Sequence, residues 1–127
     1  MEGTLVFDGD CGFCTRSRDL LARLDRHNRV RAVPFQRPEV PEQTGLTAEQ
    51  LAGSVWWLGS DGRRAHSAEA ANAALSAALG TRLPLAVYRL PLLRQAQEAL
   101  YRLVAANRHR LPGTRPWCQA YPEDCAR

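Results

Sequence analysis

Residues 4–14 read TLVFDGDCGFC, and their order predicts a strand, a tight turn and the start of a helix. The apolar, β-prone run at 4–7 ends at the polar DGD triplet, which is the pattern of a buried strand entering a turn. Apolar side chains then recur at helical spacing as far as Leu24, with charged side chains on the other faces. Cys11 and Cys14 are therefore expected in the first turn of this helix.

The rest of the chain continues the alternation of strands and helices. Strands are expected at 30–35, 54–58 and 63–66, and helices at 47–53, at 68–79 and from Pro91 to the Pro112-Gly113 pair. Pro34 lacks a backbone N–H and is best tolerated in an edge strand, which agrees with the strand order 2-1-3-4. A right-handed crossover joins the first two strands in parallel. We expect an α/β fold of the thioredoxin/glutaredoxin type, with a four-stranded mixed sheet flanked by helices and an additional C-terminal helix.

Finer signals predict where the helices begin and end. Thr47 and Gln50 have the spacing of a capping box, Ser67 is expected to cap the next helix, and Gly80 is expected to close it. The last helix carries an apolar stripe opposite a solvated face. The stripe consists of Leu93, Ala96, Leu100, Leu103, Asn107 and Leu111. We expect one domain over 1–127, with a core at about 4–112 and an irregular tail at 113–127.

Composition limits the class of protein. The chain has 127 residues and a mass of 14.1 kDa, with 45% hydrophobic and 24% charged residues. These values are typical of a soluble globular domain and exclude disorder of the whole chain. The longest uncharged apolar stretch, 51–58, is too short to cross a bilayer, and the start lacks the pattern of a secretory signal. A cytoplasmic protein without membrane insertion is expected.

The charges exclude some chemistry. The net charge is +4, and all 17 basic residues are arginine, so Schiff-base and P-loop lysine chemistry is ruled out. Residues 82–115 carry seven Arg and one Glu. Such a segment can attract nucleic acid, but interleaved aromatic residues and a recognised nucleic-acid module are both missing. No nucleic-acid partner is expected, and the oligomeric state is left open.

The cysteines carry the main functional prediction. Cys11 and Cys14 form a C-x-x-C pair where a strand gives way to a helix, and backbone amides and the helix dipole stabilise a thiolate there. We expect Cys11 to be the more accessible thiol, attacking a protein or small-molecule disulfide, and Cys14, one turn deeper, to resolve the mixed disulfide. Asp8 is expected to modulate the proton transfers. This chemistry requires no cofactor.

A structural zinc site is the alternative interpretation of the same residues. C-x-x-C is also a zinc-binding spacing, and Cys118 and Cys125 supply a second pair. The C-x6-C spacing of that second pair is poor for zinc, which favours redox chemistry. The alternative function is therefore a zinc-binding or protein-interaction module that uses Cys11, Cys14, Cys118 and Cys125. Whether the second pair forms a disulfide is left open.

The aspartates suggest a third, weaker interpretation. An apolar strand followed by D-x-D is similar to haloacid-dehalogenase-like phosphatases, in which Asp8 would be the nucleophile and Asp10 the acid/base. That chemistry needs Mg²⁺, a downstream acidic pair and usually a lysine. The chain has no lysine, and Asp61 is isolated. The D-x-D spacing is interpreted as incidental.

The motif D-x-x-C-x-x-C, formed by Asp8, Cys11 and Cys14, resembles the signature of the DCC thiol-disulfide oxidoreductases. The likeness extends through Asp61-Gly62-Arg63 to Tyr101 and Asn107-Arg108, and so spans most of 4–112. The resemblance implies a thioredoxin-like fold and protein disulfide oxidoreductase activity. Better-studied thioredoxin-like enzymes place a cis-proline before the third strand, where this chain has Ala52-Gly53-Ser54. Backbone pairing with an extended peptide is less favoured for that reason, and a small thiol or a dedicated partner suits the chain better.

Overall fold

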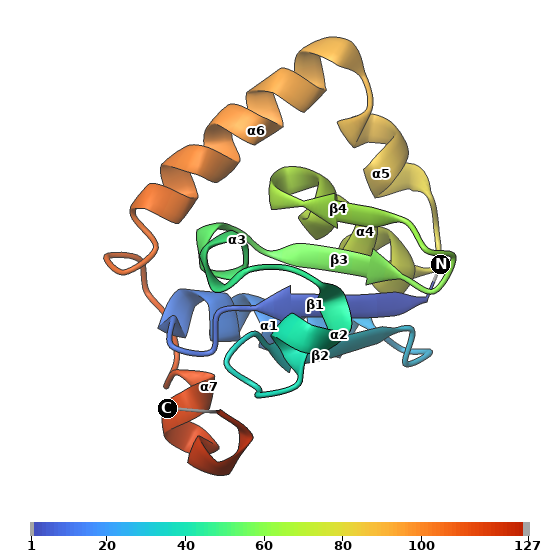
Figure 1. Ribbon diagram of the computed structural model, residues 1–127. Coiled ribbons are helices and arrows are strands. Elements are labelled where there is room, and N and C mark those ends of the chain that lie inside the picture. The colour runs from blue at the N-terminus through green and yellow to red at the C-terminus, as the bar shows by residue number, and fades with distance from the viewer. Residues whose placement is uncertain (1, 126–127) are drawn as a thin grey trace.

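The computed structural model describes residues 2–125, which contain one four-stranded sheet with the order β2-β1-β3-β4 (Figure 1). The central strand β1 (Gly3–Phe7) pairs in parallel with β2 (Val30–Pro34) and antiparallel with β3 (Trp56–Gly59), which pairs antiparallel with β4 (Arg64–His66). The predicted strand order is confirmed. Pro34 lies in the edge strand β2, where its missing N–H is best tolerated. The chain has an α/β, thioredoxin-like fold with a mixed sheet flanked by helices.

Helices cover both faces of the sheet. They are α1 (Gly12–Leu24), α2 (Val40–Thr44), α3 (Ala48–Gly53), α4 (Ser67–Leu79), α5 (Leu83–Tyr88), α6 (Pro91–Ala106), α7 (Trp117–Ala120) and the 3-10 helix η1 (Pro122–Asp124). One core cluster joins Leu5 and Trp57 to the alanines of α4, with Leu21 of α1 packed against it. On the opposite face, Val6 packs with residues from α2 and α3. Neighbouring residues of β1 therefore point to opposite, separately covered faces.

The close packing of α4 on the sheet follows from its composition. Ala70, Ala74 and Ala77 are at most 1% exposed. Because their side chains are small, the helix axis can approach the strands without leaving space between them. Gly80 closes the helix with a φ of 73°, as predicted. The predicted capping box of α3 is also confirmed, since the side chains of Thr47 and Gln50 each accept the other's backbone N–H.

Two local predictions were wrong, and one helix was not predicted. Ser67 does not cap α4: it is the first residue of the helix, and His66 is the N-cap without a side-chain hydrogen bond. The last helix, α6, ends at Ala106 rather than near 111, because the chain leaves helical geometry at Asn107. Helix α5 was not predicted. It has only six residues, with a proline in its first turn, so its apolar periodicity is too short to recognise.

The apolar stripe of α6 does not face the core. Leu100 and Leu103 are 60% and 63% exposed. The helix lies outside the sheet layers (Figure 1) and contacts α4 and α5. A different set of its side chains, including Tyr101 and Val104, lines a cavity that it shares with α1 and α4. Amphipathic spacing located the helix but did not identify its inner face, since both flanks of the helix carry apolar residues.

The tail at 113–125 is ordered rather than irregular. It forms α7 and η1, and a disulfide joins Cys118 to Cys125, which settles the pairing left open above. Arg37 donates two hydrogen bonds of 2.8 Å to the Asp124 carboxylate, and these hold the pKa of Asp124 below its usual value. The ordered structure of the tail was not predicted from the sequence, because it depends on this long-range pair of side chains and not on local helix propensity. None of the helices within residues 2–125 has the length and apolar character needed to cross a membrane.

Candidate active site

The D-x-x-C-x-x-C motif lies where β1 passes into α1. Cys11 is the N-cap of α1, with extended backbone angles, and its sulfur accepts the backbone N–H of Cys14 at 3.2 Å. The Cys11 carbonyl accepts both the backbone N–H and the hydroxyl of Thr15, at 3.0 Å each. The sulfur of Cys11 therefore sits at the N-terminus of α1, which is the positive end of the helix dipole.

The exposure of the two cysteines is the reverse of the prediction. Cys11 is fully buried, with 0% exposure, whereas Cys14 is partly exposed. The expectation that Cys11 is the more accessible thiol was therefore wrong. It assumed that the N-terminal cysteine of the pair faces solvent, as the geometry of the turn alone allows.

The C-terminal tail packs against the turn that carries Cys11. The backbone N–H of Thr114 donates to the Gly12 carbonyl at 3.2 Å, and that of Cys118 donates to the Gly9 carbonyl at 2.9 Å. These two contacts lie on either side of Cys11 in the sequence. Segment 113–118 thus runs along the turn that carries Cys11, and we call it the cover segment. Between its two contacts with the turn, the backbone N–H of Trp117 donates to the Thr15 hydroxyl at 3.1 Å.

The thiol of Cys14 holds its proton tightly. Burial is the largest cause that raises the pKa of Cys14, and together with its hydrogen bond to Cys11 it brings that pKa to about 12. The positive charge of Arg108 lowers the pKa of Cys14, and the negative charge of Asp8 raises it. Cys14 is therefore a protonated thiol at neutral pH and a hydrogen-bond donor to Cys11.

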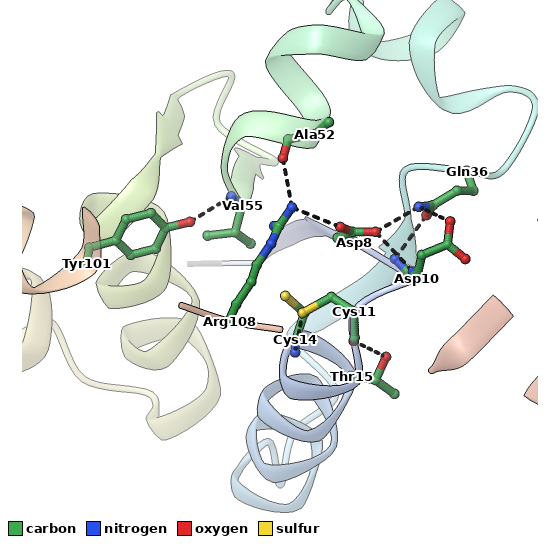
Figure 2. A network of polar contacts seen from close by, with 11 residues as sticks. Asp8, Asp10, Cys11, Cys14, Thr15, Gln36, Ala52, Val55, Tyr101 and Arg108 are labelled. Atoms are coloured by element: carbon green, nitrogen blue, oxygen red, sulfur yellow. Dashed lines mark hydrogen bonds and ion pairs between the residues drawn. The ribbon is translucent and has the colours of Figure 1, made fainter. Parts of the chain in front are cut away.

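Asp8 is held by a network of polar contacts (Figure 2). Its carboxylate lies 3.2 Å from the guanidinium of Arg108 and accepts a hydrogen bond of 2.8 Å from the amide of Gln36. It also accepts the backbone N–H of Asp10 at 3.0 Å. Gln36 accepts the backbone N–H of Gly9 at 2.9 Å and thereby braces the turn itself. Within the network, Asp8 and Arg108 place opposite charges beside Cys14.

The same part of the chain fixes the segment before β3. The Val55 N–H donates to the hydroxyl oxygen of Tyr101 at 2.9 Å, and Arg108 donates to the Ala52 carbonyl at 3.3 Å (Figure 2). No peptide bond among residues 2–125 is cis. The backbone that precedes β3 therefore has the trans geometry expected from Ala52-Gly53-Ser54, and side chains from α6 and its C-terminal extension occupy two of its polar groups.

A cavity of about 380 Å³ opens beside Cys14. Residues of α1, α4 and α6 form most of its wall, together with residues of the segment before β3. The wall includes Phe13, Leu21, Val55, Leu75, Tyr101 and Val104, with Asp8 and Arg108 also contributing. Cys14 lines this cavity and Cys11 does not. The cavity has the size of a small-molecule site and a largely apolar surface.

The structure brings together the predicted residues Asp8, Cys11 and Cys14, whereas the second cysteine pair is closed as a disulfide. Cys118 and Cys125 are bonded to each other, so they do not supply the thiolates that the four-cysteine zinc alternative requires. Within residues 2–125 there is no group of three or more His, Cys, Asp or Glu side chains arranged to hold a metal ion.

Three residues of the network were not predicted as site residues. Arg108 and Tyr101 lie in the region of family likeness, which was the available signal, but nothing in their local sequence indicates that they reach Asp8 and Val55. Gln36 follows the edge strand β2 and comes next to the turn only through the parallel pairing of β1 and β2. No short motif marks it.

A dithiol at the start of the first helix, on a β-α-β unit of this topology, defines a thioredoxin-like thiol protein. Residues 5–114 match the family described as DCC1-like thiol-disulfide oxidoreductase, and the chain belongs to that family. The resemblance noted from the motif is thus confirmed, and with it a redox role in general. Neither the curated proteins nor the solved structures include a significant match.

Proposed function

We propose that this protein is a thiol-disulfide oxidoreductase in which Cys11 attacks, Cys14 resolves and Asp8 modulates the proton transfers. The observation that carries the proposal is the asymmetry of the pair. Cys14 keeps its proton to a pKa of about 12, while its N–H donates to the sulfur of Cys11 at the helix N-terminus. The hydrogen bond from this N–H and the position at the helix N-terminus support Cys11 as the attacking sulfur, although Cys11 is the more buried residue.

The proposed reaction moves two electrons from the dithiol to a disulfide. The Cys11 thiolate attacks one sulfur of R–S–S–R′, an S–S bond forms between Cys11 and R, and R′S⁻ leaves and takes up a proton. Cys14 then loses its proton and attacks the Cys11 sulfur, so that RS⁻ leaves and becomes RSH. The products are two thiols and a Cys11–Cys14 disulfide, which a second thiol reduces to complete the cycle.

Access to Cys11 is part of the proposed mechanism. Because Cys11 has no exposed surface and the cover segment contacts the residues on both sides of it, attack requires the cover segment to move.

The negative charge of Asp8 raises the pKa of Cys14. This favours proton uptake by Cys14 when the disulfide is reduced again.

We propose that the substrates are disulfides and thiols, that no cofactor takes part, and that the compartment is the cytoplasm. A dithiol that donates electrons must be returned to its reduced state, and cytoplasmic thiol systems hold thiols reduced. The Cys118–Cys125 bond is then a structural disulfide, which is uncommon in cytoplasmic proteins.

The reduction potential of the Cys11–Cys14 pair tests the proposal. Protein equilibrated in glutathione buffers is alkylated and digested with trypsin, which cleaves after Arg16 and separates this pair from Cys118 and Cys125. We expect reversible closure between about −270 and −120 mV, the range from thioredoxin to strong oxidants. A Cys14→Ser variant should accumulate a mixed disulfide on Cys11, and a Cys11→Ser variant should not. A pair that never closes, or trapping that persists in Cys11→Ser, would overturn the assignment.

A further inference from the structure

The cavity beside Cys14 indicates what kind of molecule the dithiol meets. Its volume of about 380 Å³ is enough for a small ligand, and its wall is mainly the hydrocarbon of Phe13, Leu21, Val55 and Leu75. A polar molecule placed there would lose hydrogen bonds with water and gain few in return, whereas an apolar group gains from burial.

The backbone next to the cavity is already paired. An extended peptide would have to bind the free N–H and C=O groups of the segment before β3, in the manner of an added strand. The N–H of Val55 donates to Tyr101, and the carbonyl of Ala52 accepts from Arg108. A peptide could use these two groups only after breaking both contacts, so main-chain pairing is disfavoured at this site.

We infer that the substrate is a low-molecular-weight disulfide whose sulfur carries an apolar chain or ring, and that the apolar group occupies the cavity. This inference rests on the proposed function. With the group in the cavity, the disulfide lies beside Cys14, which lines the cavity, and its attack by the neighbouring, buried Cys11 requires the cover segment to move. Cys11 forms an S–S bond with the sulfur of the buried half, and the other half leaves as a thiolate. Cys14 then releases the buried half as a thiol, and the protein dithiol is oxidised by two electrons.

The test compares two symmetric probes, dibutyl disulfide and bis(2-hydroxyethyl) disulfide, which differ in polarity. Formation of the Cys11–Cys14 disulfide is followed by alkylation and mass spectrometry. Each rate constant is divided by the rate constant of dithiothreitol with the same probe, which removes intrinsic reactivity. Each methylene buried in the cavity contributes about a fourfold factor. We therefore expect the normalised rate constant for dibutyl disulfide to exceed that for bis(2-hydroxyethyl) disulfide by about tenfold or more.

Two neighbouring positions of α6 offer a matched pair of variants. Ala105 lines the cavity, and Ala106 is exposed and does not. Ala105→Trp should reduce the preference for dibutyl disulfide about tenfold, whereas Ala106→Trp should retain it. Ala71→Trp, which fills the cavity from an exposed position on α4, is the second filling variant if Ala105→Trp does not fold. Circular dichroism establishes that each variant is folded.

The outcomes distinguish failure of this inference from failure of the proposed function. Failure of the pair to close with either probe would overturn the proposed oxidoreductase function itself. If the pair closes with both probes and the ratio of the two rate constants equals that of dithiothreitol, the oxidoreductase function stands and the apolar substrate is overturned. Retained preference in the folded filling variants, or equal loss in Ala106→Trp, would overturn the role of the cavity. A polar linear peptide disulfide that reacts faster than dibutyl disulfide would also contradict the inference.

Discussion

The carboxylate of Asp8 and the guanidinium of Arg108 lie 3.2 Å apart, with their side chains only 10% and 21% exposed. The pair links the turn after β1 to the segment after α6. At the thiol of Cys14 the two charges act in opposite directions, since Arg108 lowers its pKa and Asp8 raises it. The ion pair therefore limits the effect of either charge on the dithiol while holding the C-terminal part of the chain against the motif.

Removing one charge of this pair should expose the effect of the other. We expect Asp8→Asn to lower the pKa of Cys14 and Arg108→Gln to raise it, because each leaves the opposite charge uncompensated. Arg108→Gln should also destabilise the protein by about 1–3 kcal/mol, since the mostly buried Asp8 carboxylate loses a charged partner. Alkylation rates against pH and urea unfolding measure the two effects. Arg110→Gln, an exposed neighbour, is the control, and shifts of equal sign in both variants would contradict the model of opposed charges.

The stability of the reduced protein should fall in alkaline solution. Burial raises the pKa of Cys14 from 9.0 to about 12, so the folded state holds this proton more tightly than the unfolded chain. Its contribution is complete below pH 9 and is lost as the pH rises from about 9 to 12. Tyr88, whose pKa is raised mainly by burial to about 12, contributes in the same range. The difference between reduced and Cys14→Ser protein isolates the cysteine, and identical alkaline profiles would refute its raised pKa.

Loss of the tail disulfide should uncover Cys11. Replacing Cys118 and Cys125 by serine should weaken the tail by about 2 kcal/mol, because the bond no longer restricts the open chain. The open fraction then increases about thirtyfold. In a Cys14→Ser background, alkylation of Cys11 should accelerate by that factor. Glu123→Gln, at an exposed position of the tail outside the cover segment, should leave the rate unchanged. An unchanged rate in the double serine variant would mean that the cover segment stays closed without the disulfide.

The hydroxyl of Tyr101 should contribute measurably to stability. Tyr101→Phe leaves the Val55 N–H without its partner, and we expect a loss of about 1 kcal/mol in the free energy of unfolding. Tyr121→Phe is the matched control, because Tyr121 is 46% exposed. Equal effects of the two substitutions would show that the hydrogen bond to Val55 contributes nothing.

Removal of metal should leave the protein folded. The zinc alternative predicts unfolding by a chelator, whereas two of its four thiols are joined in a disulfide. We expect the same thermal midpoint with and without a strong chelator, with metal content measured on the same sample. A chelator-dependent drop in the midpoint would restore the zinc interpretation.

The sequence was most informative where local patterns determine structure. Residues 4–14 predicted a strand, a turn and a helix N-terminus, and Pro34 predicted the edge of the sheet; both expectations are confirmed. The burial of Cys11 was not predictable in this way, because the residues that cover it come from the far end of the chain. Arg108 was missed as a site residue for the same reason, since its role depends on where α6 ends.

The cover segment crosses a boundary in the chain. The family match ends at residue 114, whereas Trp117 and Cys118, which anchor the cover segment to the helix and the turn, lie beyond it. The residues that exchange electrons in the proposed function therefore lie within the family match, whereas part of the cover segment lies outside it. Under the proposed function, substitutions beyond residue 114 would change how fast the dithiol reacts without changing Asp8, Arg108, Cys11 or Cys14.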